Sequence, residues 1–274
     1  MSILNETAQL VKNRLSSEID TITIQRLTIG LFFTGVKLSN GAGGISYTPV
    51  KDIPQAVCCP SSAGRIFDPF KIKGMSVADV LAGLTSREPL KVSVAIATLN
   101  ALSACCWEHG KTEHYRFQMN ADALDAVRMP EKSTVAVIGA FVPILRKLKG
   151  LECNWRVIEQ DPKTLKSDEM DHFIPADRSE ETVAAADVLI VTGVTLVNHT
   201  LEDILKVARP DAEIAVVGPT ASMLPDVLFE RGVRVVGGVR VKQPDDLLGV
   251  LAAGGSGYHF FDNLAPRIVI EKPS

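Results

Sequence analysis

The sequence predicts an α/β protein in two parts: an N-terminal α+β domain followed by a Rossmann-like domain built on a doubly wound, mostly parallel sheet. Two observations predict this fold class. In the first part, three short β-rich segments precede two helical segments, which is typical of an antiparallel sheet with helices packed on one face. In the second part, apolar β-rich segments alternate with helical ones, which is typical of a parallel sheet covered on both faces.

The first domain, residues 1–112, is expected to begin with an amphipathic helix and to continue as an antiparallel meander. Asn40-Gly41 lies between two β-rich segments and predicts a hairpin turn, because both residues tolerate positive φ. Ser76 is expected to cap a helix, with Asp79 three residues further on. The expected elements are a helix over 4–17, strands over 21–29, 31–38 and 45–48, and helices over 76–84 and 89–106.

The second domain is expected over residues 134–274. Residues 113–133 are polar and carry little periodicity, so we interpret them as the connection between the domains. Beyond them, apolar strands and helices alternate as in consecutive βα units. The expected strands are 134–139, 155–159, 187–192, 213–218, 234–237 and 267–270, with helices near 141–149, 200–208 and 221–231.

Composition and charge exclude several classes of partner. The chain has 274 residues, of which 46% are hydrophobic and 22% are charged, as in a folded globular protein. The formal net charge of −3 and the lack of a basic block give no electrostatic footprint for nucleic acid. We see no run of about 18 apolar residues that would cross a membrane, and no signal-peptide pattern. We therefore expect a cytoplasmic protein without nucleic-acid or membrane partners; a homodimer is an option that no feature specifies.

The first βα unit of the second domain partly matches a dinucleotide-binding unit. Gly139 ends the first strand, and Glu159 lies 20 residues further on, where an acidic residue binds a ribose. The glycine fingerprint is absent: Phe141 stands where a glycine would let a pyrophosphate approach, and Pro143 suits a first helical turn. The turn therefore supports the prediction of a Rossmann-like fold, and it does not support the prediction of a bound dinucleotide. An enzyme with a nucleotide-type cofactor at Gly139 and Glu159, methyltransferase-like or dehydrogenase-like, is an alternative.

Polar residues gather after the third strand of this domain, at the edge where open α/β sheets bind ligands. The segment contains Thr192, Gly193, Thr195, Asn198 and His199. A histidine here suits proton transfer or metal ligation, and the threonines are able to orient a ligand. The alternative for Asn198 is to satisfy free N–H groups at the start of the next helix.

The two following strand ends add glycines and a cation. Gly218, Pro219 and Thr220 precede an expected helix whose free N–H groups would attract an anion, unless Thr220 or Ser222 simply caps that helix. Arg240 follows another pair of glycines. It is expected either to clamp a carboxylate or phosphate or to lie in solvent.

Two features of the first domain also bear on function. Asn100 lies in an apolar helix and must find hydrogen-bond partners, either in the hairpin backbone or in a ligand between the domains. The five cysteines form no C-x-x-C pair, and we interpret them mainly as small buried apolar residues. The alternative is that Cys58 or Cys59 faces a cleft as a soft metal ligand.

These segments together resemble the putative heavy-metal-chelation family of bacterial and archaeal proteins. The resemblance rests on residues 31–48, Asn100-Ala101-Leu102, 192–200 and Gly218-Pro219-Thr220. It implies an enolase N-terminal-like domain followed by a Rossmann-like domain. It also implies a site in the cleft between the two domains and a role in binding or chelating a heavy metal.

We therefore expect a protein that binds a small ligand or a metal complex in the interdomain cleft, with or without turnover. His199 is the expected metal ligand or acid–base group, Asn198 orients the ligand, and 218–220 cradle an anion. The implied cofactor is a divalent transition metal. Such metals prefer several imidazole or thiolate ligands together, and the sequence has no spaced cluster of them, so we favour a metal held with an organic ligand. A non-catalytic accessory protein is a second alternative.

Overall fold

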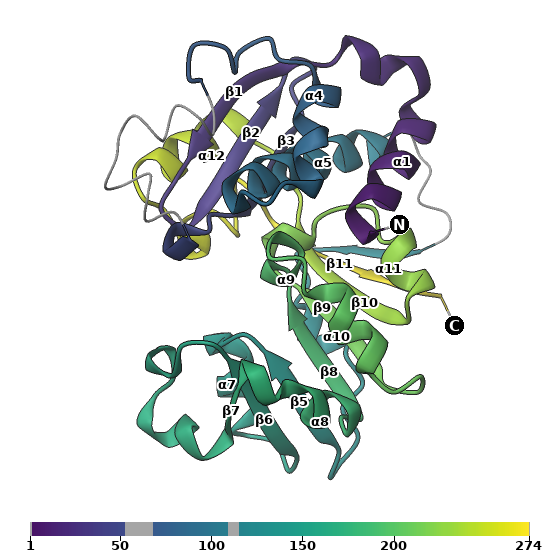
Figure 1. Cartoon of the computed structure of the whole chain (residues 1–274), viewed down its shortest axis with the longest axis vertical. Coiled ribbons are helices and arrows are strands. Elements are labelled where there is room, and N and C mark those ends of the chain that lie inside the picture. The colour runs from purple at the N-terminus through teal and green to yellow at the C-terminus, as the bar shows by residue number, and fades with distance from the viewer. Residues whose placement is uncertain (1, 53–67, 109–114, 274) are drawn as a thin grey trace.

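Two β-sheets organise the chain, one with three antiparallel strands and one with eight mostly parallel strands (Figure 1). The computed structural model describes residues 2–52, 68–108 and 115–273. The α/β fold class is confirmed.

The smaller sheet is the predicted meander, with strand order β1-β2-β3. Its hairpin turn has Gly41 at a φ of +89°, and the Asn40 side chain accepts the N–H of Ala42 at 3.2 Å. The first strand begins later than predicted, because Ser16–Thr21 form a 3-10 helix. The strands are β1 (Ile24–Ile29), β2 (Phe33–Leu38) and β3 (Gly43–Tyr47).

In the described part of the first domain, three α-helices accompany this sheet. Ser76 caps one of them as predicted, since its Oγ accepts the N–H of Asp79 at 3.1 Å. The longest helix is apolar on every side, and every residue from Val92 to Trp107 is buried. Among the described residues it alone is long and apolar enough to cross a membrane, but 94% of that apolar window is buried inside the protein. The helices are α1 (Ile3–Leu15), α4 (Val77–Leu81) and α5 (Pro89–Glu108).

The larger sheet has the strand order β4-β11-β10-β9-β8-β5-β6-β7. Strands β5 to β10 are parallel, and their order is the 3-2-1-4-5-6 order of doubly wound nucleotide-binding sheets, which reverses between β5 and β8. β11 is antiparallel to both of its neighbours. The strands are β4 (Arg116–Met119), β5 (Thr134–Ile138), β6 (Asn154–Glu159), β7 (Phe173–Pro175), β8 (Val188–Thr192), β9 (Glu213–Val217), β10 (Val233–Val239) and β11 (Arg267–Glu271).

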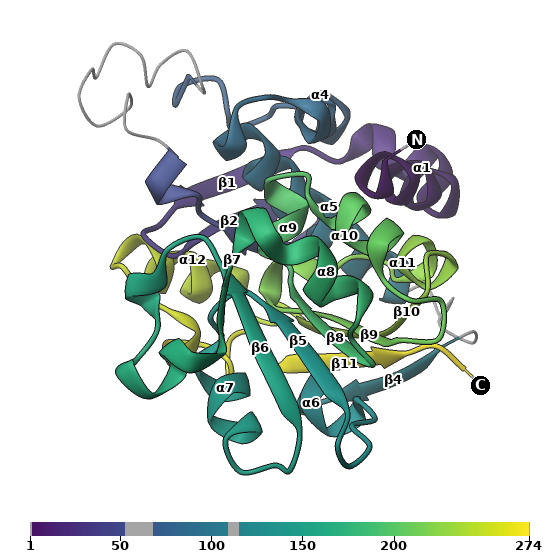
Figure 2. The same ribbon diagram turned by 60° about the horizontal axis from the view of Figure 1, so that its bottom comes forward.

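Helices cover both faces of the larger sheet (Figure 2). Alternation along β5 explains how: Val135 and Val137 pack in the core under α6 and α7, whereas Ala136 and Ile138 pack in the core on the other face. The helices are α6 (Ala123–Ala126) and α7 (Val142–Leu148) on one face, and α8 (Ser179–Ala184), α9 (Val194–Val197), α10 (Leu201–Val207) and α11 (Asp226–Glu230) on the other.

The last helix, α12 (Pro244–Ala252), leaves the larger sheet and packs on the smaller one. It lies so close to β1 and β2 that a Cβ at Gly30 would be 2.5 Å from the carbonyl oxygen of Leu251. The three-stranded sheet is therefore enclosed between α5 and α12 (Figure 1). The stretch 113–133, expected to be a simple connection, contributes β4 and α6 to the larger sheet and its cover.

Asn100 joins the two sheets. Its Nδ2 donates to the carbonyl oxygens of Ile45 at 2.8 Å and Thr220 at 3.1 Å, and lies 3.4 Å from that of Pro219. The Oγ1 of Thr220 in turn accepts the N–H of Tyr47 at 3.0 Å. Of the two roles considered for Asn100, the structure supports the backbone contact, which here links β3 to the loop after β9.

We expect Asn100→Ala to lower the free energy of unfolding by about 1–3 kcal/mol, because the buried carbonyl groups of Ile45 and Thr220 would lose their donor. Urea denaturation measures this loss. Asn13→Ala, at an exposed position of α1, is the control and should stay within about 0.5 kcal/mol of the parent. Equal effects of the two substitutions would contradict the joining role.

Candidate functional site

The turn after β5 lies where the strand order reverses. Gly139 adopts a φ of +96°, and a Cβ there would lie 3.0 Å from the Cγ2 of Thr192, at the end of β8. Phe141 precedes α7, which begins with Pro143 in its first turn as predicted. The two strand ends thus pack against each other at the position where a dinucleotide would be expected to cross.

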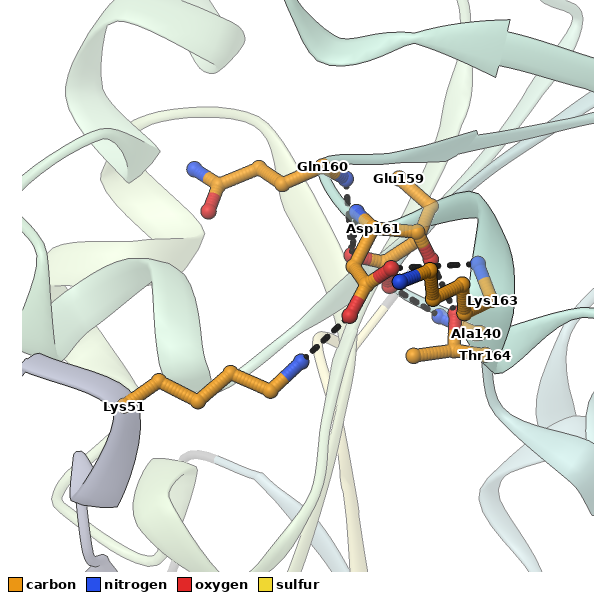
Figure 3. Close-up of polar contacts among 7 residues, drawn as sticks. All are labelled: Lys51, Ala140, Glu159, Gln160, Asp161, Lys163 and Thr164. Carbon is orange, nitrogen blue, oxygen red and sulfur yellow. Dashed lines mark hydrogen bonds and ion pairs between the residues drawn. The ribbon is translucent and has the colours of Figure 1, made fainter.

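Glu159, at the end of β6, is used by the backbone of that turn (Figure 3). Its carboxylate accepts the N–H groups of Ala140 at 3.0 Å, Gln160 at 2.7 Å and Asp161 at 3.3 Å. Both oxygens have partners, so Glu159 holds the turn in place. If a cofactor ribose were bound at Gly139 and Glu159, the Glu159 carboxylate would have to give up hydrogen bonds to these backbone N–H groups and bind the ribose hydroxyls instead.

An ion pair from the smaller sheet reaches the same region. Lys51, in the short 3-10 helix Val50–Asp52 after β3, lies with its Nζ 2.8 Å from Oδ2 of Asp161 (Figure 3). The hydrogen bond from Lys51, followed by the N–H of Lys163, lowers the pKa of Asp161 below its ordinary value. The same contact raises the pKa of Lys51.

The polar segment after β8 mostly bonds to itself. Thr195 Oγ1 donates to the carbonyl oxygen of Thr192 at 2.6 Å. Asn198 Oδ1 accepts the N–H and the hydroxyl of Thr200 at 3.3 and 2.7 Å, just before α10, whereas no side chain caps α10 itself, so the capping role considered for Asn198 is not observed. His199 is an exposed turn residue with a φ of +59° between α9 and α10.

The predicted anion cradle after β9 has a different structure. Gly193 packs against this loop, since a Cβ there would lie 3.1 Å from the backbone nitrogen of Ala221. Residues 219–221 form a 3-10 turn, and the expected helix begins only at Asp226. Thr220 is buried against β3, and Ser222 bonds to the Pro219 carbonyl and the Val239 N–H at 2.7 and 2.8 Å. Neither residue caps α11, because Thr220 bonds to β3 and Ser222 bonds to its own loop and to β10.

An open pocket lies beside this loop, and we call it the sheet-edge pocket. It encloses about 560 Å³ of empty space, part of it open to solvent. Gly218 lines it with a φ of +118°, and an added Cβ there would have no neighbour closer than 3.9 Å. The described lining residues are Ala121–Leu124, Phe141, Pro143, Ile144, Val217–Pro219, Gly237–Val239, Phe261, Arg267 and Ile268.

Two charged side chains give this apolar pocket its polarity. Arg267 Nη1 lies 3.3 Å from Oδ2 of Asp122, and its guanidinium lies 5.7 Å from the centre of the Phe261 ring. Sequence analysis identified Gly218 and Pro219 here and missed these three residues. Asp122 lies in the segment interpreted as a connection, and Arg267 enters only because β11 pairs antiparallel with β10.

Arg240 lies in a second pocket, between the two parts of the chain, and not beside Gly218. Its Nη2 is 3.3 Å from Oε1 of Glu108 at the end of α5. The predicted site residues therefore do not meet in one place. Gly218 and Pro219 line the sheet-edge pocket, Arg240 lines the second pocket, and Asn100 and Thr220 lie in the packed contact between the sheets. The others lie outside both pockets, in the turn after β5 and at the end of β6 (Gly139, Glu159) and in the segment that ends β8 and follows it (Thr192, Gly193, Thr195, Asn198, His199).

A site for a transition metal requires several ligand side chains close together. Within residues 2–52, 68–108 and 115–273, no group of three or more His, Cys, Asp or Glu side chains could hold a metal ion. His199 therefore belongs to no such group. Cys105 and Cys106 are buried, as the apolar interpretation predicts, and burial raises the pKa of the Cys105 thiol. Cys58 and Cys59 lie outside the described residues.

Two family models described as "Putative heavy-metal chelation" match the chain, DUF4213 over residues 12–103 and DUF364 over residues 122–270. An uncharacterised protein of Methanocaldococcus jannaschii is 25% identical over 161 residues, which are 57% of this chain and 57% of that protein. The chain thus matches little more than half the length of this curated relative.

Two crystal structures of DUF364 proteins with unknown function share the fold. The protein from Pyrococcus horikoshii has a TM-score of 0.77 and 20% identity, and the protein from Desulfitobacterium hafniense has a TM-score of 0.72 and 17% identity. Each comparison covers 98% of this chain and 99% of the other. At these identities the similarity establishes the fold.

We expect His199→Gly to keep the free energy of unfolding or to raise it by up to about 1 kcal/mol, because glycine adopts positive φ without steric cost. Urea denaturation beside His199→Ala, which retains a Cβ at this φ, measures the difference. A loss above 1 kcal/mol in the glycine variant would mean that the imidazole makes contacts that matter.

Lys51→Met is expected to raise the pKa of Asp161 towards its ordinary value, because the principal cause of the lowered pKa is removed. Carboxyl-carbon NMR titration measures the shift, with exposed Lys12→Met as control. A group with a lowered folded-state pKa adds stability above its ordinary pKa and loses it as pH falls through the folded value. The variant should therefore lose less stability than the parent on acidification below about pH 4.

Proposed function

We propose that this chain, which belongs to the DUF364 family described as "Putative heavy-metal chelation", binds a small organic molecule, or a metal ion carried by one, in the sheet-edge pocket. Family membership supports the link to metals. The pocket supports the link to an organic ligand, because its lining is largely apolar and includes two aromatic side chains, Phe141 and Phe261.

The observation that carries the proposal is the backbone at Gly218. This residue ends β9 at the edge where open α/β sheets take ligands, and its φ of +118° favours glycine. The space in front of its Cα is free to 3.9 Å, so a ligand is able to approach the main chain. We therefore place the proposed binding site in this pocket, and not in the cleft expected around Asn100 and Thr220, where β3 and α5 are in direct contact with the loop after β9.

The chemistry of the described donors favours a complexed metal over a bare ion. Asp122 and Arg267 are the charged side chains among the described lining residues, and they face each other. One carboxylate beside a guanidinium is a poor site for a free transition metal, which requires several imidazole or thiolate ligands. The same pair suits the polar end of an organic chelator, whose apolar body would lie between the aromatic rings. We propose binding as the activity, in the cytoplasm, without a nucleic-acid partner.

Ala121→Leu should abolish ligand binding without removing a polar group, because the larger side chain would fill the sheet-edge pocket that Ala121 lines. Thermal unfolding of the metal-stripped protein measures this against Cu²⁺ or Zn²⁺ alone and against each metal with citrate, histidine or 2,2′-bipyridine. A ligand at about 100 times its Kd stabilises by about 2.7 kcal/mol, which is several degrees in Tm.

The expected result is a Tm increase with at least one complex in the parent, little increase with the bare metal, and none in Ala121→Leu. Ala252→Leu, at an exposed position at the end of α12, is the matched control and should respond like the parent. An equal response to bare metal and complex, or an unaffected response in Ala121→Leu, would refute the proposal.

A further inference from the structure

The second pocket, which we call the interdomain pocket, lies between the smaller sheet and the loop after β10. It encloses about 1120 Å³ of empty space, part of it open to solvent. Gly41 opens onto space, since an added Cβ there would have no neighbour within 4 Å. The described lining residues are Asn40–Gly43 of the hairpin, Ala104, Cys105 and Glu108 of α5, Met119, and Arg240–Lys242 with Pro244.

The backbone fixes two cations on one side of this pocket. The N–H groups of Arg240 and Lys242 donate to the carbonyl oxygens of Pro266 and Leu264 at 3.0 and 2.8 Å, so the backbone that follows β10 is held in place up to a bend at Lys242. Both cationic residues line the pocket. Val241 between them packs on the hairpin, where a Cβ at Gly43 would lie 2.6 Å from its Cγ1.

Most of the side-chain N–H donors of Arg240 and Lys242 have no acceptor among the described residues. Arg240 has five N–H donors, and among the described residues its side chain makes one polar contact, the 3.3 Å ion pair with Glu108, whose own side chain is 65% exposed. In the described part of the chain, the Lys242 side chain has neither a hydrogen bond nor an ion pair. Asp245 nearby is paired with Lys37. Among the described lining residues, two cations thus stand against the single carboxylate of Glu108.

We propose that the interdomain pocket is a second binding site, for a small oxyanion that carries two negative charges, of the phosphate or dicarboxylate class. Arg240 would bind two oxygens with its planar fork, and Lys242 would supply the second charge. The negative carboxyl end of α5 would attract Arg240, which explains why this residue lies beside Glu108. The same attraction does not account for Lys242, which has no partner among the described residues. An anion bridging both cations accounts for the two together.

Isothermal titration at constant ionic strength tests this with two probes, inorganic phosphate and malonate, which distinguish tetrahedral from dicarboxylate ligands. Arg240→Gln and Lys242→Gln should each weaken binding at least tenfold, about 1.4 kcal/mol, because each removes one of the two charges. Glu108→Gln should strengthen binding, because Arg240 would lose its competing carboxylate. Arg234→Gln and Lys73→Gln, two exposed cations elsewhere, are the matched controls and should bind like the parent.

The proposal is overturned if neither probe binds the parent at millimolar concentration, or if the Arg240→Gln, Lys242→Gln double variant binds like the parent. Ala121→Leu separates the two sites, since it should leave anion binding unchanged even where it abolishes binding in the sheet-edge pocket. A Tm within a few degrees of the parent in each variant establishes that the fold persists.

Discussion

The burial of α5 along its length from Val92 to Trp107 is the constraint on which the rest of the structure depends. A helix that is apolar on every side has no face to present to water, so protein must surround it. The smaller sheet covers one side, and the loop after β9 with α9 covers another. Its few polar side chains, Asn100 and Ser103 among them, reach into these covering elements and bond to their backbone. The two parts of the chain consequently share a continuous core that runs from Ile3 to Ile270.

Much of the fold follows from patterns that are local in sequence. The apolar run 134–138 and the Asn40-Gly41 turn predicted a buried strand and a hairpin because burial and positive φ leave direct signatures. β4 and β7 escaped prediction, since they are short edge strands of mixed polarity. The antiparallel direction of β11 depends on a chain reversal after α12 that no local pattern encodes. Leu247, Leu248 and Leu251 did carry a helical spacing that would have revealed α12.

The site was less predictable, because residue type does not say what a side chain faces. Thr220 was expected near a strand end and Asn100 in an apolar helix. Both lie there, but Asn100 donates to the Thr220 carbonyl and Thr220 accepts the N–H of Tyr47, so the contact between the sheets uses both side chains. Asn198 and Glu159 satisfy N–H groups of nearby turns. Gly218 was expected to allow close approach at a strand end, and its positive φ is backbone geometry that a single glycine does encode. Arg267 and Asp122 meet from opposite ends of the second half of the chain, and only the tertiary structure brings them together.

The position of α12 has a consequence for which segments of the gene are able to recombine. The helix that closes the smaller sheet is encoded more than 190 residues after that sheet's last strand, beyond most of the larger sheet. A gene fragment carrying the first part alone would lack the lid over Ile45 and Phe33, and a fragment carrying the second part would carry an apolar helix with nothing to cover. Selection therefore acts on the two segments as one unit, and exchange by recombination at the point between them would leave both products with exposed cores.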